Sequence, residues 1–165
     1  MGIIDADTHI DETDATWEFM RDSDLAYKPT TTYPTNPDPK LPLARYWVID
    51  GRRQVRFVRS DKDSGTVVES RELLDIDVRL KHMDDLGTDI QVIYPTLFLM
   101  EATEKPEIST AMRRSYNRWL GDRCSKSSGR LRWVCMPPVQ ALDAMDEELR
   151  WAKENGACGV LKKGD

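Results

Sequence analysis

Long apolar runs are absent from this sequence, as are the short motifs that mark several large enzyme classes. No apolar stretch approaches the roughly 18 residues that a membrane-spanning helix requires. The sequence has no glycine-rich phosphate loop, no GxSxG turn and no catalytic pairing of cysteine with histidine. These absences argue against a membrane protein, a nucleotide-binding protein and an enzyme with a serine or cysteine nucleophile.

Blocks of basic residues are also missing, although 32% of the residues are charged. Acidic and basic side chains are interspersed and the formal net charge is −5, whereas nucleic-acid-binding surfaces are rich in Lys and Arg. The amino-terminal residues lack the basic and apolar regions of a signal peptide. Three cysteines without a CxxC pair, Cys124, Cys135 and Cys158, are typical of reduced thiols. We therefore expect a cytoplasmic protein with no nucleic-acid or membrane partner.

Residues 18–72 show little regular periodicity and predict an insertion. Residues 21–42 contain five of the nine prolines, a composition that disfavours helices and central strands and predicts a long loop. Residues 60–65 are charged and predict a flexible connection. Loops of such length are usually functional lids or disordered segments.

The insertion contains one β-hairpin signal. Residues 46–49 and 54–58 are rich in β-branched and aromatic residues and flank Asp50 and Gly51. Asp-Gly between such runs is typical of a tight hairpin turn. Because two arginines follow the glycine, we expect the turn to be longer than two residues.

The remaining sequence alternates between strand and helix patterns. Strand patterns occupy residues 3–7, 90–94, 131–136 and 158–161. Apolar residues at helical spacing lie between them: Ile76, Leu80 and Met83; Ile108, Met112, Tyr116, Trp119 and Leu120; Leu142, Met145, Leu149 and Ala152. Strict alternation predicts an α/β fold with a parallel sheet. Four such units form either a small open sheet or half of a (β/α)8 barrel, which typically needs about 250 residues.

The residues that carry chemistry follow the first predicted strand. Asp7 and His9 lie at its carboxyl end, where βα proteins build their sites. Because they are two positions apart on an extended backbone, both side chains should point the same way. A carboxylate oxygen and an imidazole nitrogen on one face suit a divalent transition metal. Asp5 has the same parity and is a candidate for orienting His9.

A solvated turn is the alternative interpretation of this segment, because a single DxH motif is a weak signal. His82, the other histidine, lies beside acidic residues on a predicted helix and is expected at the surface. Residues at or near strand ends are candidates for binding substrate: Glu12, Trp17, Tyr94 and Thr96, with Phe98 and Met136 as further pocket residues. For these, ordinary loop packing is the alternative.

Several segments resemble the amidohydrolase-related family, which includes aminocarboxymuconate-semialdehyde decarboxylase. Residues 3–12 are similar to the opening strand of that family, in which His-x-His or Asp-x-His supplies two metal ligands, and Asp7 and His9 match those two positions. Residues 79–92 resemble the family's first helix and second strand. Later segments resemble the following units in the same order: residues 117–120, 129–131 and 156–160.

The resemblance implies a (β/α)8 barrel with one divalent metal, Zn²⁺ as the first expectation and Mn²⁺ as the second, bound by Asp7 and His9. It implies hydrolysis or non-oxidative decarboxylation of a small, carboxylated or cyclic organic substrate. It also implies an essential histidine after the fifth strand and an aspartate after the eighth, both expected beyond Asp165. Some superfamily members use a modified lysine after the fourth strand. Lys162 and Lys163 lie near that place, where solvated charges or contacts to a substrate carboxylate are the preferred interpretation.

Residues 1–165 are therefore expected to form a partial metal-dependent hydrolase barrel of about four βα units, a half-barrel. The insertion at residues 18–72, with its hairpin, would lie over the barrel mouth and help to select the substrate. The alternative is a catalytically incomplete half-barrel. Its open strand edges and apolar face would need cover, and we expect a homo-oligomer or a complementary half.

Overall fold

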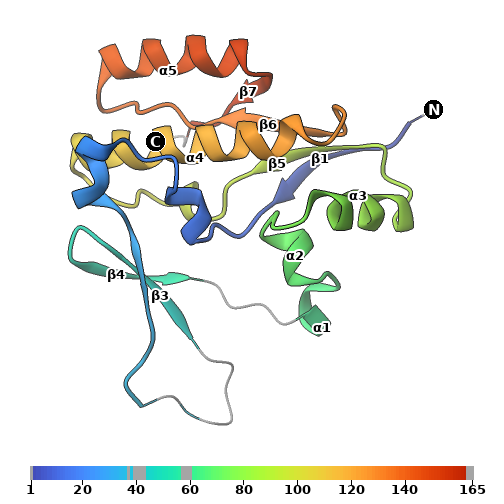
Figure 1. Ribbon diagram of the computed structural model, residues 1–165, viewed down its shortest axis with the longest axis horizontal. Coiled ribbons are helices and arrows are strands. Elements are labelled where there is room, and N and C mark those ends of the chain that lie inside the picture. The colour runs from blue at the N-terminus through green and yellow to red at the C-terminus, as the bar shows by residue number, and fades with distance from the viewer. Residues whose placement is uncertain (1, 37, 39–43, 57–60, 163–165) are drawn as a thin grey trace.

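The main sheet has four parallel strands, and the computed structural model describes residues 2–36, 38, 44–56 and 61–162 (Figure 1). The strands lie in the order β1 (Ile4–His9), β5 (Ile90–Tyr94), β6 (Leu131–Cys135), β7 (Ala157–Val160). Helix α3 (Ile76–Asp85) precedes β5, α4 (Pro106–Ser125) connects β5 to β6, and α5 (Leu142–Glu154) connects β6 to β7. The predicted alternation of strands and helices is confirmed.

The strand order decides between an open sheet and part of a barrel. Each new strand lies beside the preceding one and extends the sheet in the same direction. Right-handed crossovers then place successive helices on the same face. A doubly wound open sheet instead reverses its strand order at a switch point. The arrangement is therefore that of about half of a (β/α)8 barrel.

Local chemistry sets the ends of the helices. The Asp75 side chain accepts hydrogen bonds from two backbone N–H groups in the first turn of α3. Just beyond the end of this helix, Gly87 has a φ of +69°, and the N–H of Thr88 donates to the carbonyl of Met83. This pattern is a Schellman motif, in which glycine is favoured because a side chain would be strained at that φ.

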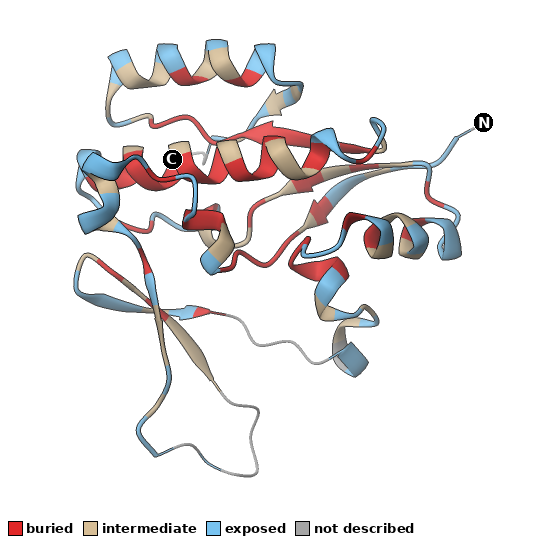
Figure 2. Ribbon diagram, viewed as in Figure 1, coloured by how far each residue is buried: buried red, intermediate tan, exposed pale blue. Residues whose placement is uncertain are grey.

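Helix α4 lies at the centre of the core (Figure 2). Its predicted apolar stripe is buried, with at most 1% of the surface exposed at Met112, Tyr116, Trp119 and Leu120. The three cysteines are free, as expected. Every helix within the described ranges is too short or too polar to cross a membrane.

The insertion contains a small antiparallel sheet in the order β2 (Thr30–Thr32), β3 (Arg45–Ile49), β4 (Arg52–Arg56). The hairpin prediction is confirmed, but the expectation of a longer turn is wrong. Ile49 pairs directly with Arg52, and Asp50 and Gly51 have φ values of +51° and +72°. Two consecutive positive φ angles make the tight turn that Asp-Gly favours. Residues 57 and 58 of the predicted second strand lie outside the described residues.

The insertion is also more regular than a long loop. Short helices occur at η1 (Asp14–Trp17), η2 (Asp22–Tyr27), α1 (Asp61–Ser64) and α2 (Val68–Arg71), and η3 (Leu97–Leu99) follows β5. The loop prediction is wrong at Thr30–Thr32, because three β-branched residues pair with β3 between two prolines. The flexible connection predicted at residues 60–65 is a helical turn at Asp61–Ser64, held by Arg71, whose Nη1 lies 3.0 Å from an Asp61 oxygen; residue 60 lies outside the described residues.

Replacing Asn117 by Ala tests how α4 holds the end of β6. The Asn117 amide donates to the carbonyl of Met136 (3.0 Å) and accepts from its N–H (2.9 Å), and all three groups are buried. We expect the substitution to lower the free energy of unfolding by about 1–3 kcal/mol, because buried backbone groups lose their partners. Urea unfolding measures this. Asn155→Ala, at an exposed position, is the control, and equal losses in the two variants would contradict the assignment.

Candidate metal centre

One extra residue in β1 determines where Asp7 and His9 point. Asp5 pairs with Gln91 and Thr8 pairs with Ile93, so three steps along β1 match two steps along β5. Such a β-bulge reverses the alternation of side chains. As a result, Asp5 and Thr8 share one face, and the Thr8 hydroxyl donates to the Asp5 carboxylate.

Asp5 therefore does not orient His9, and that expectation is wrong. Its carboxylate also accepts from Gln91 at 3.4 Å, and Gln91 in turn accepts from the buried Arg79 of α3 at 2.8 Å. The hydrogen bond from Thr8 holds the pKa of Asp5 below its usual value. Asp5 belongs to a polar network between the sheet and α3.

Asp7 and His9 lie on the opposite face from Asp5. The Nε2 atom of His9 is 3.4 Å from Oδ1 of Asp7, and the Asp7 side chain is 87% exposed. The Nδ1 atom of His9 lies 2.7 Å from the carbonyl oxygen of Pro95. Because a carbonyl can only accept, Nδ1 carries the hydrogen and Nε2 of the neutral ring keeps its lone pair. Metal-binding histidines are commonly held in this way.

These two side chains fit a divalent metal as part of its ligand set. One hard carboxylate oxygen and one imidazole nitrogen lie 3.4 Å apart, and both side chains have exposed surface. Within the described ranges, no group of three or more His, Cys, Asp or Glu side chains could hold a metal ion. The described residues thus supply two candidate ligands.

Glu12 occupies a buried position just beyond the candidate ligands. Its two carboxylate oxygens accept from the N–H groups of Thr96 (3.0 Å) and Leu97 (2.9 Å). Burial raises the pKa of Glu12 to about 7, and the two backbone donors oppose that shift. Glu12 therefore holds or releases a proton near neutral pH.

A cavity of about 560 Å³ lies between the insertion and the segment that follows β5. Its wall is largely apolar and includes Asp11 and Glu12; Trp47, Arg53, Gln54, Val55 and Arg56 from the hairpin; and Thr96, Leu97, Leu99, Met100 and Glu101. Residues of the insertion therefore form much of the wall of this cavity.

Two of the four predicted substrate-binding residues line the cavity, and the other two do not. Glu12 and Thr96 line the cavity. Tyr94 pairs with His9 in the sheet, and the two ring centroids are 6.0 Å apart. Trp17 has no exposed surface and packs edge-on against Trp47 in the core.

The further pocket candidates do not line the cavity either, among the residues that the structure describes. Phe98 and Met136 are buried in the core, at 4% and 2% exposure. Lys162 is exposed, and Lys163 lies outside the described residues. Among the described residues, the predicted candidates that line the cavity are Glu12, which follows β1, and Thr96, which follows β5.

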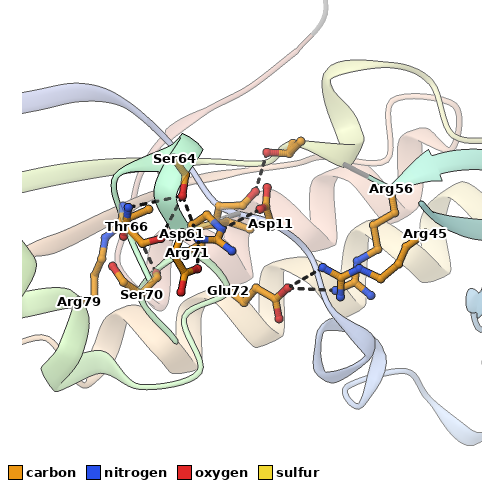
Figure 3. A network of polar contacts seen from close by, with 12 residues as sticks. Asp11, Arg45, Arg56, Asp61, Ser64, Thr66, Ser70, Arg71, Glu72 and Arg79 are labelled. Atoms are coloured by element: carbon orange, nitrogen blue, oxygen red, sulfur yellow. Dashed lines mark hydrogen bonds and ion pairs between the residues drawn. The ribbon is translucent and has the colours of Figure 1, made fainter. Parts of the chain in front are cut away.

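Sequence reasoning missed the hairpin wall and the charged residues that anchor it (Figure 3). Arg56 lies over the Trp47 ring at 4.6 Å and 3.4 Å from an oxygen of the buried Glu72. Arg71 of α2 lies 3.6 Å from Asp11. Isolated charged residues in an aperiodic segment form no recognisable pattern. The signal that the sequence did offer for this wall was the excess of arginines around the hairpin.

Replacing Glu12 by Gln should remove a pH dependence of stability. With a pKa of about 7 in place of 4.5, the folded protein keeps a proton that the unfolded chain has lost. The contribution of Glu12 to the free energy of unfolding is thus fully present below pH 4.5 and is lost as the pH rises through 7, by roughly 3 kcal/mol. Urea unfolding from about pH 4 to 8 should show the wild type losing stability relative to Glu12→Gln. The exposed Glu104→Gln is the control, and a pH-independent difference for Glu12→Gln would refute the assignment.

Comparison with known proteins gives one sequence relative and several related structures. The chain is 35% identical over 94 residues to gamma-resorcylate decarboxylase of Rhodococcus jostii (strain RHA1), covering 56% of this chain and 29% of the relative. An amidohydrolase from Mycobacterium avium subsp. paratuberculosis K-10 superposes with a TM-score of 0.68 at 18% identity, over 97% of this chain and 49% of that chain. No protein-family model matches.

A dihydroxybenzoic acid decarboxylase from Polaromonas sp. JS666, solved with manganese and the inhibitor 2-nitroresorcinol, has a TM-score of 0.59 at 20% identity. The superposition covers 99% of this chain and 38% of that chain. This chain therefore spans about half or less of the length of the proteins that it matches. The resemblance and the half-barrel architecture predicted from the sequence are confirmed. The chain is similar in sequence to part of a gamma-resorcylate decarboxylase, and its fold is similar to about half of the fold of the amidohydrolase and to part of the fold of the decarboxylase.

Proposed function

We propose that this chain forms part of a metal-dependent decarboxylase, and that Asp7 and His9 are two of the metal ligands. The observation that carries the proposal is the pairing of the Asp7 carboxylate with Nε2 of His9 at 3.4 Å, with Nδ1 occupied by the Pro95 carbonyl. Decarboxylation is preferred to hydrolysis because the sequence relative is a decarboxylase. Zn²⁺ and Mn²⁺ both suit a ligand set of carboxylate and imidazole, and a related structure contains manganese.

The residues of this chain have distinct parts in that chemistry. A bound divalent ion would act as a Lewis acid that polarises a substrate oxygen or lowers the pKa of a water. Asp7 adds negative charge to the site, and His9 offers a nitrogen whose direction the Pro95 carbonyl fixes. The largely apolar cavity beside Glu12 and Thr96 would exclude water from a small aromatic acid. We assign Glu12, Tyr94 and Thr96 to the substrate side of the site. Trp17 would support it from the core.

Metal titration tests the ligand assignment. Mn²⁺ binding to the wild-type chain, followed by electron paramagnetic resonance, should weaken at least about tenfold in Asp7→Asn and in His9→Ala, because even indirect partners of metal ligands contribute 10–100-fold to affinity. The matched controls are Asp143→Asn, at an exposed position on α5, and His82→Ala, which removes the other histidine. Equal Mn²⁺ affinity in all five proteins would refute the metal site. Binding of 2,6-dihydroxybenzoate that requires Mn²⁺ and is lost in His9→Ala would support the substrate class.

We also propose that the open side of the sheet is covered by association, with a second copy or with a complementary barrel half. In the described sheet, β1 and β7 are the edge strands, and Ile4 and Val160 on them are 60% and 55% exposed. Unpaired edges with exposed apolar residues favour pairing with another chain.

Sedimentation velocity tests the association. We expect the wild-type chain to sediment as a dimer or larger species at micromolar concentration, and Val160→Lys to shift the distribution toward the monomer, because a charge on the edge opposes strand pairing. Val67→Lys, at an exposed apolar position outside the sheet, is the control. A wild-type chain that stays monomeric over this range would contradict self-association and leave the complementary half as the partner.

A further inference from the structure

The direction of the His9 ring depends on a single backbone carbonyl, that of Pro95. The hydrogen bond between Nδ1 and this oxygen is 2.7 Å long. It fixes both the tautomer and the rotation of the ring, and so determines where Nε2 points.

Backbone and side-chain contacts bind the segment around Pro95 to the end of β1. The N–H of Ile10 donates to the carbonyl of Tyr94 (3.2 Å), and the Thr96 hydroxyl donates to the carbonyl of Ile10 (2.6 Å). These two bonds join Ile10, just after β1, to the end of β5, and the N–H groups of Thr96 and Leu97 are not used in them.

Glu12 satisfies those N–H groups. Each of its carboxylate oxygens accepts one hydrogen bond, from Thr96 at 3.0 Å and from Leu97 at 2.9 Å. Thr96 is the residue that caps η3, and its own side chain makes no capping hydrogen bond. Glu12 is 3% exposed, so water cannot readily replace its oxygens. The carboxylate thus provides the cap that the local sequence lacks.

We infer that Glu12 is a positioning residue for His9: it clamps the Thr96–Leu97 amides and thereby fixes the Pro95 carbonyl that orients the imidazole. This inference rests on the proposed role of His9 as a metal ligand. Glu12 does not touch the metal in this arrangement and acts on His9 through the backbone that follows β5. It also gives a physical reason for burying a carboxylate beside two backbone N–H groups.

The variants follow from the geometry of the clamp. Glu12→Gln keeps the size of the side chain, but its amide group can accept from only one of the two N–H groups and turns a donor toward the other. Glu12→Asp retains the charge on a side chain shorter by one methylene. Glu104→Gln, the same change at an exposed position, is the control.

The first measurement is the tautomer of His9 in metal-free protein, by long-range ¹H–¹⁵N correlation NMR at a pH above 7, where Glu12 is ionised. We expect wild type and Glu104→Gln to show the hydrogen on Nδ1, and Glu12→Gln to show a mixture of the two tautomers at His9, with His82 unchanged as an internal reference. Backbone ¹H–¹⁵N spectra confirm that each variant is folded. Glu12→Asp provides a second perturbed variant if Glu12→Gln does not fold.

The second measurement is Mn²⁺ affinity, which we expect to fall about tenfold or more in Glu12→Gln and to remain near the wild-type value in Glu104→Gln. An unchanged His9 tautomer in folded Glu12→Gln or Glu12→Asp would overturn the inference, whatever happens to Mn²⁺. A changed tautomer together with Mn²⁺ binding that ignores His9→Ala would support the clamp and overturn the metal site. The two failures are therefore distinguishable.

Discussion

The candidate metal centre depends on the extra residue in β1. Strict alternation would have placed Asp5, Asp7 and His9 on one face of the strand. The bulge separates them, so that Asp5 joins Gln91 and Arg79 between the sheet and α3, whereas Asp7 and His9 face the other way. Two carboxylates that are two positions apart in the sequence therefore have different surroundings: Asp5 joins a polar network, and the exposed Asp7 lies beside His9.

The carboxyl ends of β1 and β5 behave as one unit because contacts cross between them in both directions. His9 reaches across to Pro95, and Thr96 and Leu97 reach back to Ile10 and Glu12. Hydrogen bonds made in both directions restrain the two strand ends together. The histidine, its carbonyl partner and the buried carboxylate consequently form a continuous polar structure beside the cavity.

The periodicity of apolar residues and the positions of glycine and proline made most of the fold predictable. The apolar stripes of α3, α4 and α5, and the glycines and prolines between elements, gave the order of strands and helices. The proximity of Asp7 and His9 was predictable from their spacing at the end of one strand. The bulge in β1 was not predictable, because one extra residue in a strand leaves no mark in the sequence. For that reason the prediction placed Asp5 on the wrong face of the strand. Trp17 and the hairpin wall depend on how the insertion packs, which aperiodic sequence does not encode locally.

The cavity and the candidate ligands are built from different parts of the chain. Asp7 and His9 belong to a strand of the main sheet, and much of the cavity wall belongs to β3 and β4 of the insertion. The shape of the cavity is thus determined mainly by the hairpin of the insertion, whereas the orientation of Asp7 and His9 is determined by the main sheet. Shape and orientation are therefore encoded in separate stretches of the sequence.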